Sequence, residues 1–319
     1  MKSLTLIFFR ILLRCQSYIG KIGGHQTIEL SEACIKSKGT IYHEIGHMIG
    51  LFHEQNRGDR DKYVKVIWEE IEPEQQSMFS NYDEIIDPLN VTYDYGSVLH
   101  YSSTAYSTSG KYTLVTINPK AQQTIGQRFS FSFKDFLIIN RAYCSTKCQN
   151  IPPDEKIECD HQGFNHPNRC DECICPSGFT GKKCDELENC ISSNCSDDSQ
   201  RTFEIENDIP LTLTTPNKIR KARGLQAIWH IKHIKQNDDN FPQWRDTGFR
   251  FCNTEIKMKS DSNEVLIMLY MGSPDVGQDL MEEIDTTPIE LEIKAVRDSG
   301  EFNIVTIVIF SLLIISKIC

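Results

Sequence analysis

Short runs of alternating polar and apolar residues recur in the second half of the chain. They are FEIE at 203–206, AIWHIKHI at 227–234, EVLIMLY at 264–270 and IELEIKAV at 289–296. Successive side chains of a strand point to opposite faces of its sheet, so this alternation predicts half-buried strands. Residues 195–297 are therefore expected to form a small β-sandwich.

A different spacing dominates the first half, where the sequence reads HEIGHMIGLFH. His43 and His47 are four residues apart, so on a helix their rings project from one face and reach one metal ion. Gly50 can adopt a positive φ and end the helix, which brings His53 in as a third ligand from another direction. Three protein nitrogens leave one position of a zinc ion open, as in catalytic zinc sites. The pattern predicts one Zn²⁺ per chain.

Glu44 lies between the first two histidines and has the chemistry of a general base. Zinc lowers the pKa of bound water from near 16 to about 7, which makes a nucleophile available at neutral pH. Glu44 would take the proton of this water and pass it to the leaving amine. These residues predict hydrolysis of a peptide bond without an acyl-enzyme.

Further segments narrow the family. CQSYIGKIGG, HEQNRGDRDKYV, YDYGSVLHY and TIGQRFSFS lie between Cys15 and Cys144 and resemble the astacin family of zinc endopeptidases, within the metzincin group. The resemblance implies an α+β metzincin protease domain at residues 15–145. It also implies that the substrates are extracellular proteins or peptides.

The resemblance also implies roles for single residues. Tyr101 matches a tyrosine that moves between zinc and the oxyanion. Arg128 matches a position where a basic residue favours an acidic side chain after the scissile bond, and Gln16 lies in the segment that runs along substrate. Glu54 matches a glutamate in a buried network with the mature N-terminus, and Cys15 is expected to pair with Cys34. Arg57 and Arg60 are expected to form ion pairs with Asp59 or Asp61.

Two features depart from the family pattern. Leu99 stands where the family has a methionine under the zinc, and because the two side chains have similar volumes we expect an intact apolar floor. Only residues 1–14, MKSLTLIFFRILLR, precede the matching segment. They read as a secretory signal or as a strand over residues 4–14 continuing into CQSYIG, and we favour the strand in an N-terminally truncated domain. Glu54 would then lose its expected partner.

The cysteines indicate an oxidising compartment and a second module. Thirteen cysteines are present, clustered between 144 and 195, which is typical of secreted proteins. Residues 148–185 end in CPSGFTGKKC and resemble an EGF-like module stabilised by disulfides. That resemblance implies the pairs Cys148–Cys170, Cys159–Cys173 and Cys175–Cys184. A second zinc site using the CxxC sequence, His161 and His166 is the less favoured alternative.

Residues 195–297, after the EGF-like module, loosely resemble a CUB domain of degenerate type. Cys195 and Cys252 lack evident partners there, and the pairing of Cys144, Cys190 and Cys319 is also left open. The module would contact substrate or matrix. An apolar tail at 302–316 has fifteen residues, short of the roughly twenty that span a bilayer, so attachment of this secreted chain to a membrane is left open.

Charge and sequons complete the prediction. The net charge of −10 gives no reason to expect nucleic acid as a partner. Asn90 and Asn194 begin glycosylation sequons, which fits an extracellular protein. We expect a secreted zinc endopeptidase. The alternatives are an inactive zinc-binding relative with a regulatory role and a membrane-tethered adhesion protein.

Overall fold

The computed structural model describes residues 6–11, 14–149, 151–152 and 156–189, and after these only the strands β10 to β18. The chain divides into two compact units, the first formed by Met1–Asn150 with Arg245–Arg250 and the second by the remaining residues. Each unit is described by itself.

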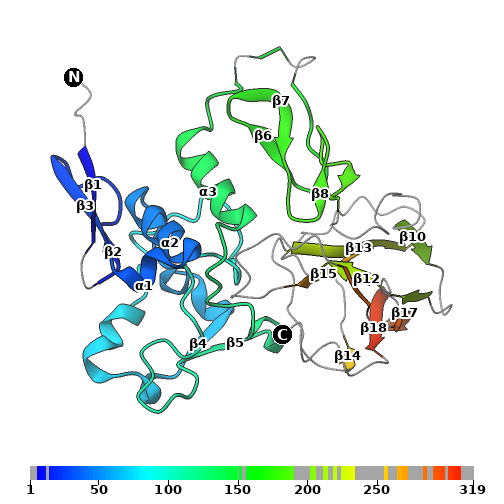
Figure 1. The fold of residues 1–319 in the computed structure, drawn as a ribbon, viewed down its shortest axis with the longest axis horizontal. Coiled ribbons are helices and arrows are strands. Elements are labelled where there is room, and N and C mark those ends of the chain that lie inside the picture. The colour runs from blue at the N-terminus through cyan, green and yellow to red at the C-terminus, as the bar shows by residue number, and fades with distance from the viewer. Residues whose placement is uncertain are drawn as a thin grey trace. The chain divides into compact units, whose positions relative to one another are not determined.

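A three-stranded sheet opens the first unit (Figure 1). Its central strand is β3 (His25–Leu30), which pairs in parallel with β1 (Leu6–Ile11) and antiparallel with β2 (Gln16–Ser17). A strand thus forms inside segment 4–14. The expectation that it continues into the next segment is wrong, because β1 and β2 lie on opposite sides of β3 and run in opposite directions.

Two helices follow the sheet and pack against it. They are α1 (Glu32–Ile35) and α2 (Lys38–Met48), and the side chain of Ser37 caps α2 by accepting a hydrogen bond from the Thr40 amide at 3.3 Å. A disulfide between Cys15 and Cys34 ties α1 to the segment before β2. The apolar face of α2 rests on buried residues of β3 and α1, a cluster formed by Ile28, Leu30, Cys34, Ile41, Ile45 and Met48.

The rest of the first unit contains little regular structure. Strand β4 (Val64–Val66) pairs antiparallel with β5 (Leu114–Thr116), and α3 (Phe133–Tyr143) begins at a capping box between Ser132 and Asp135. A second core cluster consists of Val64, Val66, Ile71, Phe79, Tyr93, Tyr101, Leu114 and Ile125. The connecting 3₁₀ helices are η1 (Glu54–Asn56), η2 (Arg60–Lys62), η3 (Trp68–Glu70), η4 (Pro73–Phe79) and η5 (Pro119–Ala121).

Two small hairpins begin the second unit. They join β6 (Phe164–His166) to β7 (Arg169–Ile174) and β8 (Phe179–Thr180) to β9 (Glu186–Leu187). Such short strands bury little apolar surface, so the stability of this segment depends on its cross-links.

Strands occur at all four alternating runs of the second half. They form one sheet of order β10-β13-β15, another of order β11-β17-β18-β14, and the pair β12-β16. Their bounds are Thr202–Ile205 (β10), Leu211–Thr214 (β11), Lys218–Arg220 (β12), Gly224–His233 (β13), Glu255–Lys257 (β14), Glu264–Met271 (β15), Glu283–Asp285 (β16), Glu290–Asp298 (β17) and Glu301–Ile309 (β18). Packing of these sheets as a sandwich stays a prediction.

Part of the apolar tail is a strand. β18 pairs antiparallel with both β17 and β14, and residues 310–316 lie outside the described residues, as do Asn194, Cys190, Cys195, Cys252 and Cys319. Among the described residues, no helix combines the length and apolar character needed to cross a membrane.

Candidate metal centre

Helix α2 places two histidines and a glutamate on adjoining positions of one buried face. His43, Glu44 and His47 are all buried. The amide of Ile49 donates to the His47 and Ile45 carbonyls, and helical geometry ends there. The helix therefore presents the first two candidate ligands side by side, as their four-residue spacing predicts.

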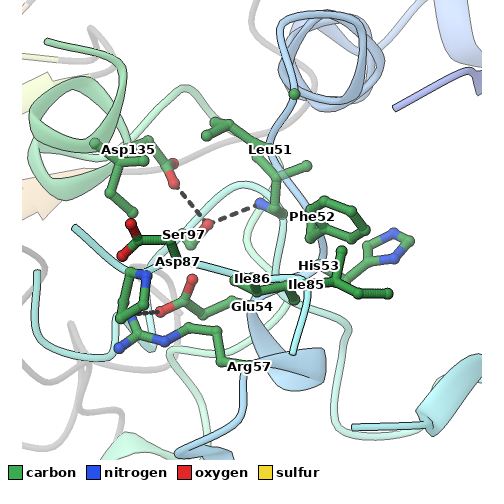
Figure 2. Close-up of a pocket in the computed structure, with 14 residues that line it drawn as sticks. Leu51, Phe52, His53, Glu54, Arg57, Ile85, Ile86, Asp87, Ser97 and Asp135 are labelled. Atoms are coloured by element: carbon green, nitrogen blue, oxygen red, sulfur yellow. Dashed lines mark hydrogen bonds and ion pairs between the residues drawn. The ribbon is translucent and has the colours of Figure 1, made fainter. Parts of the chain in front are cut away.

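Gly50 turns the chain toward the third histidine. Its φ is 102°, a region that side chains with a Cβ rarely adopt, and the amide of Leu51 still donates to the Gly46 carbonyl at 2.9 Å. Figure 2 shows the segment after the turn, with Leu51, Phe52 and His53 in succession. The predicted positive φ at Gly50 is thus confirmed.

The three imidazoles meet at one point. The Nε2 atoms of His43 and His47 are 3.1 Å apart, those of His47 and His53 are 3.1 Å apart, and those of His53 and His43 are 3.2 Å apart. Ligands of a tetrahedral zinc ion with metal–nitrogen distances near 2.0–2.1 Å lie about 3.3 Å from each other. Among the described residues this is the one group of three or more histidine, cysteine or acidic side chains close enough to share a metal.

The tautomers of these histidines fit a cation. His43 donates from Nδ1 to the Val98 carbonyl at 2.8 Å, and His47 donates from Nδ1 to the Leu51 carbonyl at 2.8 Å. Because a carbonyl only accepts, each Nδ1 carries the proton and each Nε2 has a free lone pair. Burial lowers the pKa of His43 to about 3 and also lowers the pKa of His47 and of His53. Neutral rings with converging lone pairs form a donor set suited to Zn²⁺.

Glu44 supplies a carboxylate next to this donor set. Burial raises its pKa to about 7, while the positive charge of Arg128 acts in the opposite direction. Its Oε2 atom is buried and has no hydrogen-bond partner among the described residues. A buried carboxylate with a free oxygen and a pKa near neutrality is suited to accept and return a proton.

A family model described as Astacin, a peptidase family, matches residues 3–144, the stretch that contains this centre. This region of the chain belongs to the astacin family. The family consists of zinc peptidases, and the His43, His47 and His53 triad has the donor set for its metal.

Curated relatives of the chain are nematode zinc metalloproteinases. Zinc metalloproteinase nas-36 of Caenorhabditis elegans is 45% identical over 292 residues, which are 82% of this chain and 46% of that protein. Zinc metalloproteinase dpy-31 of Brugia malayi is 30% identical over 326 residues, which are 91% of this chain and 52% of that protein. The chain spans about half the length of the curated relatives it matches.

A solved structure is also similar. High choriolytic enzyme 1, a hatching enzyme zinc-protease from the medaka fish Oryzias latipes, has 36% sequence identity and a TM-score of 0.41. The match covers 43% of this chain and 68% of that one.

In this astacin region, Tyr101 lies against the third histidine. Its ring centroid is 4.4 Å from that of His53, and its amide donates to Oε1 of Gln55 at 3.0 Å. Burial raises the pKa of Tyr101, so the phenol keeps its proton. Gln55 follows the third histidine by two residues and is fully buried, and no sequence motif marks it for this role.

Leu99 forms the apolar floor expected of the astacin methionine position. Its side chain is 1% exposed, and its Cδ2 atom lies 2.8 Å from where a Cβ on Gly46 would stand. The neighbouring Val98 carbonyl holds His43. The leucine therefore packs directly under the metal-binding helix.

The predicted substrate residues have different surroundings. Arg128 is half-buried and donates from Nη1 to the carbonyls of His100 and Gln127 at 3.0 and 2.8 Å. Its backbone also touches the metal-binding helix, since a Cβ on Gly39 would lie 1.8 Å from the Arg128 carbonyl oxygen. Gln16 lies on β2 and donates to Glu29 at 2.6 Å. Through its hydrogen bond to the His100 carbonyl, Arg128 is thus held against the turn that carries Tyr101.

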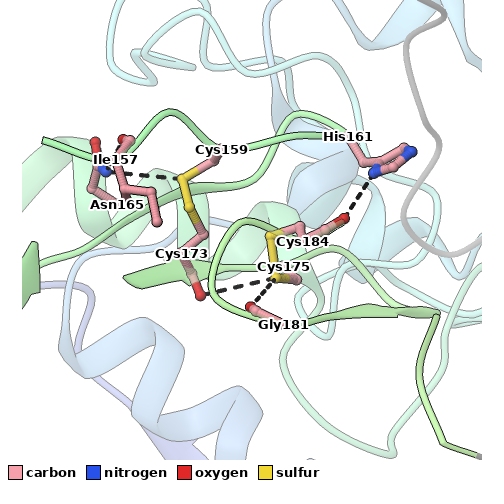
Figure 3. Close-up of a disulfide and its surroundings, with 8 residues drawn as sticks. All are labelled: Ile157, Cys159, His161, Asn165, Cys173, Cys175, Gly181 and Cys184. Carbon is pink, nitrogen blue, oxygen red and sulfur yellow. Dashed lines mark hydrogen bonds between the residues drawn. A yellow bond between two sulfur atoms is a disulfide. The ribbon is translucent and has the colours of Figure 1, made fainter. Parts of the chain in front are cut away.

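Both cysteines of the CxxC sequence, Cys170 and Cys173, are disulfide-bonded, and Figure 3 shows the bridge of Cys173. Disulfides join Cys159 to Cys173 and Cys175 to Cys184, the pairs that the EGF-like resemblance implied. His161 donates to the Cys184 carbonyl at 2.8 Å and stacks on the Phe179 ring at 3.8 Å. Cys148 and Cys170 are also disulfide-bonded, which leaves their mutual pairing a prediction. Bridged sulfurs are not thiolate ligands, so the disulfide interpretation holds for the described pairs.

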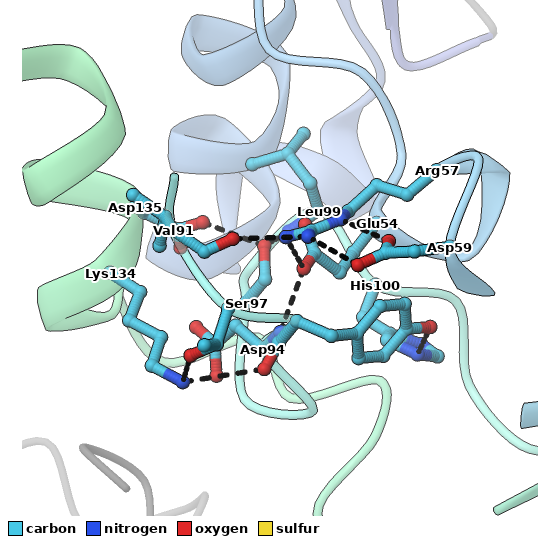
Figure 4. Close-up of polar contacts among 12 residues, drawn as sticks. Glu54, Arg57, Asp59, Val91, Asp94, Ser97, Leu99, His100, Lys134 and Asp135 are labelled. Atoms are coloured by element: carbon cyan, nitrogen blue, oxygen red, sulfur yellow. Dashed lines mark hydrogen bonds and ion pairs between the residues drawn. The ribbon is translucent and has the colours of Figure 1, made fainter. Parts of the chain in front are cut away.

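A buried network lies behind His53 (Figure 4). Glu54 accepts from Arg57 at 3.0 Å and from the Asp94 amide at 2.7 Å. Glu54 and Arg57 border a cavity of about 120 Å³. Asp135 accepts from the Ser97 hydroxyl at 2.7 Å. The expectation for Arg57 and Arg60 is confirmed, because their ion pairs with Asp59 and Asp61 measure 2.9 and 3.0 Å.

For the Asp135 part of this network the sequence offered one signal. Ser132 and Asp135 have the three-residue spacing of a capping box, yet the second acceptor oxygen of Asp135 reaches the Ser97 turn 38 residues away. Among the described residues, Glu54 has Arg57 and the Asp94 amide as partners.

Proposed function

We propose that the chain is a zinc-dependent endopeptidase that hydrolyses peptide bonds of extracellular proteins. The observation that carries this proposal is the convergence of three histidine Nε2 atoms, 3.1–3.2 Å apart, beside the buried carboxylate of Glu44. The astacin family match and the zinc metalloproteinase relatives support it.

Each residue has a distinct task in this proposal. Zinc at the triad would lower the pKa of an attacking water and polarise the scissile carbonyl. Glu44 accepts the proton of that water through its free Oε2 and returns it to the leaving nitrogen. Tyr101 offers its neutral hydroxyl to the oxygen on which negative charge develops. Burial around Glu44 and the histidines excludes bulk water and strengthens these interactions.

Substrate contacts are proposed for two residues. Both described hydrogen bonds of the Arg128 side chain are donated by Nη1. We propose that its Nη2 and Nε groups bind an acidic substrate side chain after the scissile bond. Gln16 lies on β2, whose outer edge carries no other strand of the described sheet. An extended peptide can pair with such an edge.

The Glu44→Gln variant tests the proposal. It keeps the size of the side chain and removes the base, so kcat for a quenched peptide should fall by about 10²–10⁴-fold while zinc stays bound at one ion per chain. The control is Glu69→Gln, which changes an exposed glutamate of η3 and should leave kcat unchanged. Peptide cleavage and metal content are measured on the same preparations.

Two results would contradict the proposal. A folded wild-type protein that lacks zinc has no metal centre of the proposed kind. A protein that holds zinc but cleaves no peptide in an extended library is the inactive regulatory relative rather than an enzyme.

The remaining modules are proposed to act outside the cell. Astacin peptidases are typically extracellular, and the three described disulfides fit that compartment. We assign residues 148–185 to an EGF-like module and 195–297 to a CUB-like module that contacts matrix or substrate. Asn90 lies exposed in a left-handed turn with φ of 59°, and we assign it as a glycosylation site.

A further inference from the structure

The peptide unit between Ile49 and Gly50 connects the end of α2 to the segment that carries the third candidate ligand. Ile49 has φ and ψ of −86° and 3°, whereas Gly50 has a φ of 102°. A rotation of this peptide plane changes the ψ of Ile49 and the φ of Gly50 together, and glycine accepts either sign of φ at little cost. Gly50 therefore permits the ligand turn without enforcing it.

Hydrogen bonds hold both polar groups of this peptide. Its N–H, on Gly50, donates to the His47 carbonyl at 2.8 Å, and that carbonyl also accepts from the Gly20 amide at 2.7 Å. Its C=O, on Ile49, accepts from the Tyr143 hydroxyl at 2.5 Å. Carbonyls at the end of a helix lack an intrahelical donor, so another group has to supply one. The Tyr143 hydroxyl supplies it here and thereby holds the peptide plane in one orientation.

Helix α3 reaches the metal site at both of its ends. In its first turn, Asp135 accepts from the Val98 amide at 3.0 Å, and the Val98 carbonyl in turn accepts from His43. Tyr143 is the last residue of the same helix, and its hydroxyl lies 3.4 Å from where a Cβ on Gly50 would stand. The helix thus supports both the carbonyl that orients one ligand and the turn that delivers another.

We propose that Tyr143 is a positioning residue whose hydroxyl selects the orientation of the Ile49–Gly50 peptide that delivers His53 to the triad. The inference rests on the metal site of the proposed function and adds a residue to it. A ligand that is held in place before the metal arrives loses less conformational freedom on binding, so the affinity for zinc is higher. Tyr143 acts through the turn rather than as a ligand.

A double-mutant cycle on zinc affinity tests the proposal. Tyr143→Phe keeps the ring and removes the hydroxyl, and because Tyr143 is 63% exposed the fold should stay intact. The zinc dissociation constant should rise about 3- to 10-fold, the effect of one hydrogen bond. In a His53→Ala background the same change should have no further effect, because the ligand that the turn delivers is absent. Competition with chelators of graded affinity measures the constants, and equal losses in both backgrounds would overturn the proposal.

A second readout needs neither zinc nor catalysis. In metal-free protein labelled with ¹⁵N, Tyr143→Phe should displace or broaden the amide signal of Gly50, because the peptide plane is then free to rotate. Tyr112→Phe, which changes another exposed tyrosine, should leave that signal unchanged. An unchanged Gly50 signal in Tyr143→Phe overturns the proposal. If the wild type cleaves no peptide, the proposed function fails, and the NMR comparison still decides whether Tyr143 positions the turn.

Discussion

At the scale of single residues, burial determines which side chains of the site carry charge. His43, His47 and His100 are enclosed with only carbonyl, hydroxyl or imidazole groups as partners, so the neutral form of each ring is favoured. Glu44 keeps a proton to higher pH than an exposed glutamate. The site thus combines neutral donors with a base whose charge is sensitive to its surroundings.

His100 makes the stability of the first unit dependent on pH. Its Nε2 accepts from the Tyr93 hydroxyl at 2.7 Å, its Nδ1 donates to the Tyr101 carbonyl at 2.7 Å, and burial lowers its pKa to about 4. Between about pH 6.5 and 4 the unfolded state binds more protons than the folded state, so the free energy of unfolding falls as pH falls. Across this pH range, the decrease in the free energy of unfolding that is due to His100 is about 3 kcal/mol.

Urea unfolding of the wild type and of His100→Asn across this pH range measures how much His100 contributes to the pH dependence of stability. The variant should be less stable at pH 8 and should lose less stability on acidification than the wild type. Parallel pH profiles for the two proteins would show that His100 is not responsible.

Substitutions at Leu99 test whether leucine forms the apolar floor as well as the methionine of the family does. Leu99→Met conserves volume and should change the free energy of unfolding by less than about 1.5 kcal/mol. Leu99→Ala leaves a cavity under α2 and should lower it by about 2–5 kcal/mol. Denaturant unfolding of zinc-loaded protein measures both, and similar values for the two variants would contradict the packing of Leu99 against Gly46.

At the scale of elements, the site is built from a helix, the turn after it and a loop more than forty residues later. The helix brings His43 and His47 together, the Gly50 turn adds His53, and the Val98 carbonyl orients the first ring. On the other side of the turn, the hydroxyl of Tyr143 in α3 donates to the Ile49 carbonyl at 2.5 Å. The geometry of the turn therefore controls whether three ligands can meet.

Gly50→Ala should lower zinc affinity about tenfold, because a Cβ disfavours the backbone conformation that delivers His53. Gly23→Ala is a matched control. Gly23 also has a positive φ, of 85°, but a Cβ there would meet nothing within 4 Å and the residue lies outside the ligand turn. Zinc competition with a chromogenic chelator measures both variants, and equal losses of affinity would contradict a specific role for the Gly50 turn.

At the scale of the whole molecule, disulfides occur in both units, whereas the metal-binding triad lies in the first unit. The first unit contains the triad and the Cys15–Cys34 disulfide, whereas the second begins with short hairpins cross-linked by Cys159–Cys173 and Cys175–Cys184. A ligand that binds only the folded state stabilises the unit that binds it. Zinc should therefore act on the first unit alone.

Removal of zinc by a chelator should lower the midpoint of thermal unfolding of the first unit. When the free zinc concentration is about a thousand times the dissociation constant, bound zinc stabilises the folded unit by about 4 kcal/mol, and the chelator removes this stabilisation. The His53→Ala variant should not respond to the chelator, because it lacks a ligand. His25→Ala, which changes an exposed histidine outside the triad, should respond like the wild type. Calorimetry measures all three proteins, and a chelator effect in His53→Ala would contradict the proposed ligand set.

Local periodicity allowed much of the site to be predicted. The four-residue spacing of His43 and His47, the glycine at 50 and the alternation at 264–270 each depend on contacts within a few residues, so the helix, the turn and strand β15 follow from them. The continuous N-terminal strand was wrong, because pairing with β3 depends on a partner distant in sequence rather than on the pattern of the strand itself.

The sequence by itself determined the candidate zinc ligands, the candidate base and the cysteine-rich character of the chain, because spacing and residue chemistry are local properties. Only the tertiary structure decided that the Val98 carbonyl orients His43, that Gln55 holds the Tyr101 backbone and that Asp135 reaches the Ser97 turn. A carbonyl, a glutamine or an aspartate occurs at many positions and carries no signal of its own. Its role arises when folding brings it into a buried space where each polar group must find a partner.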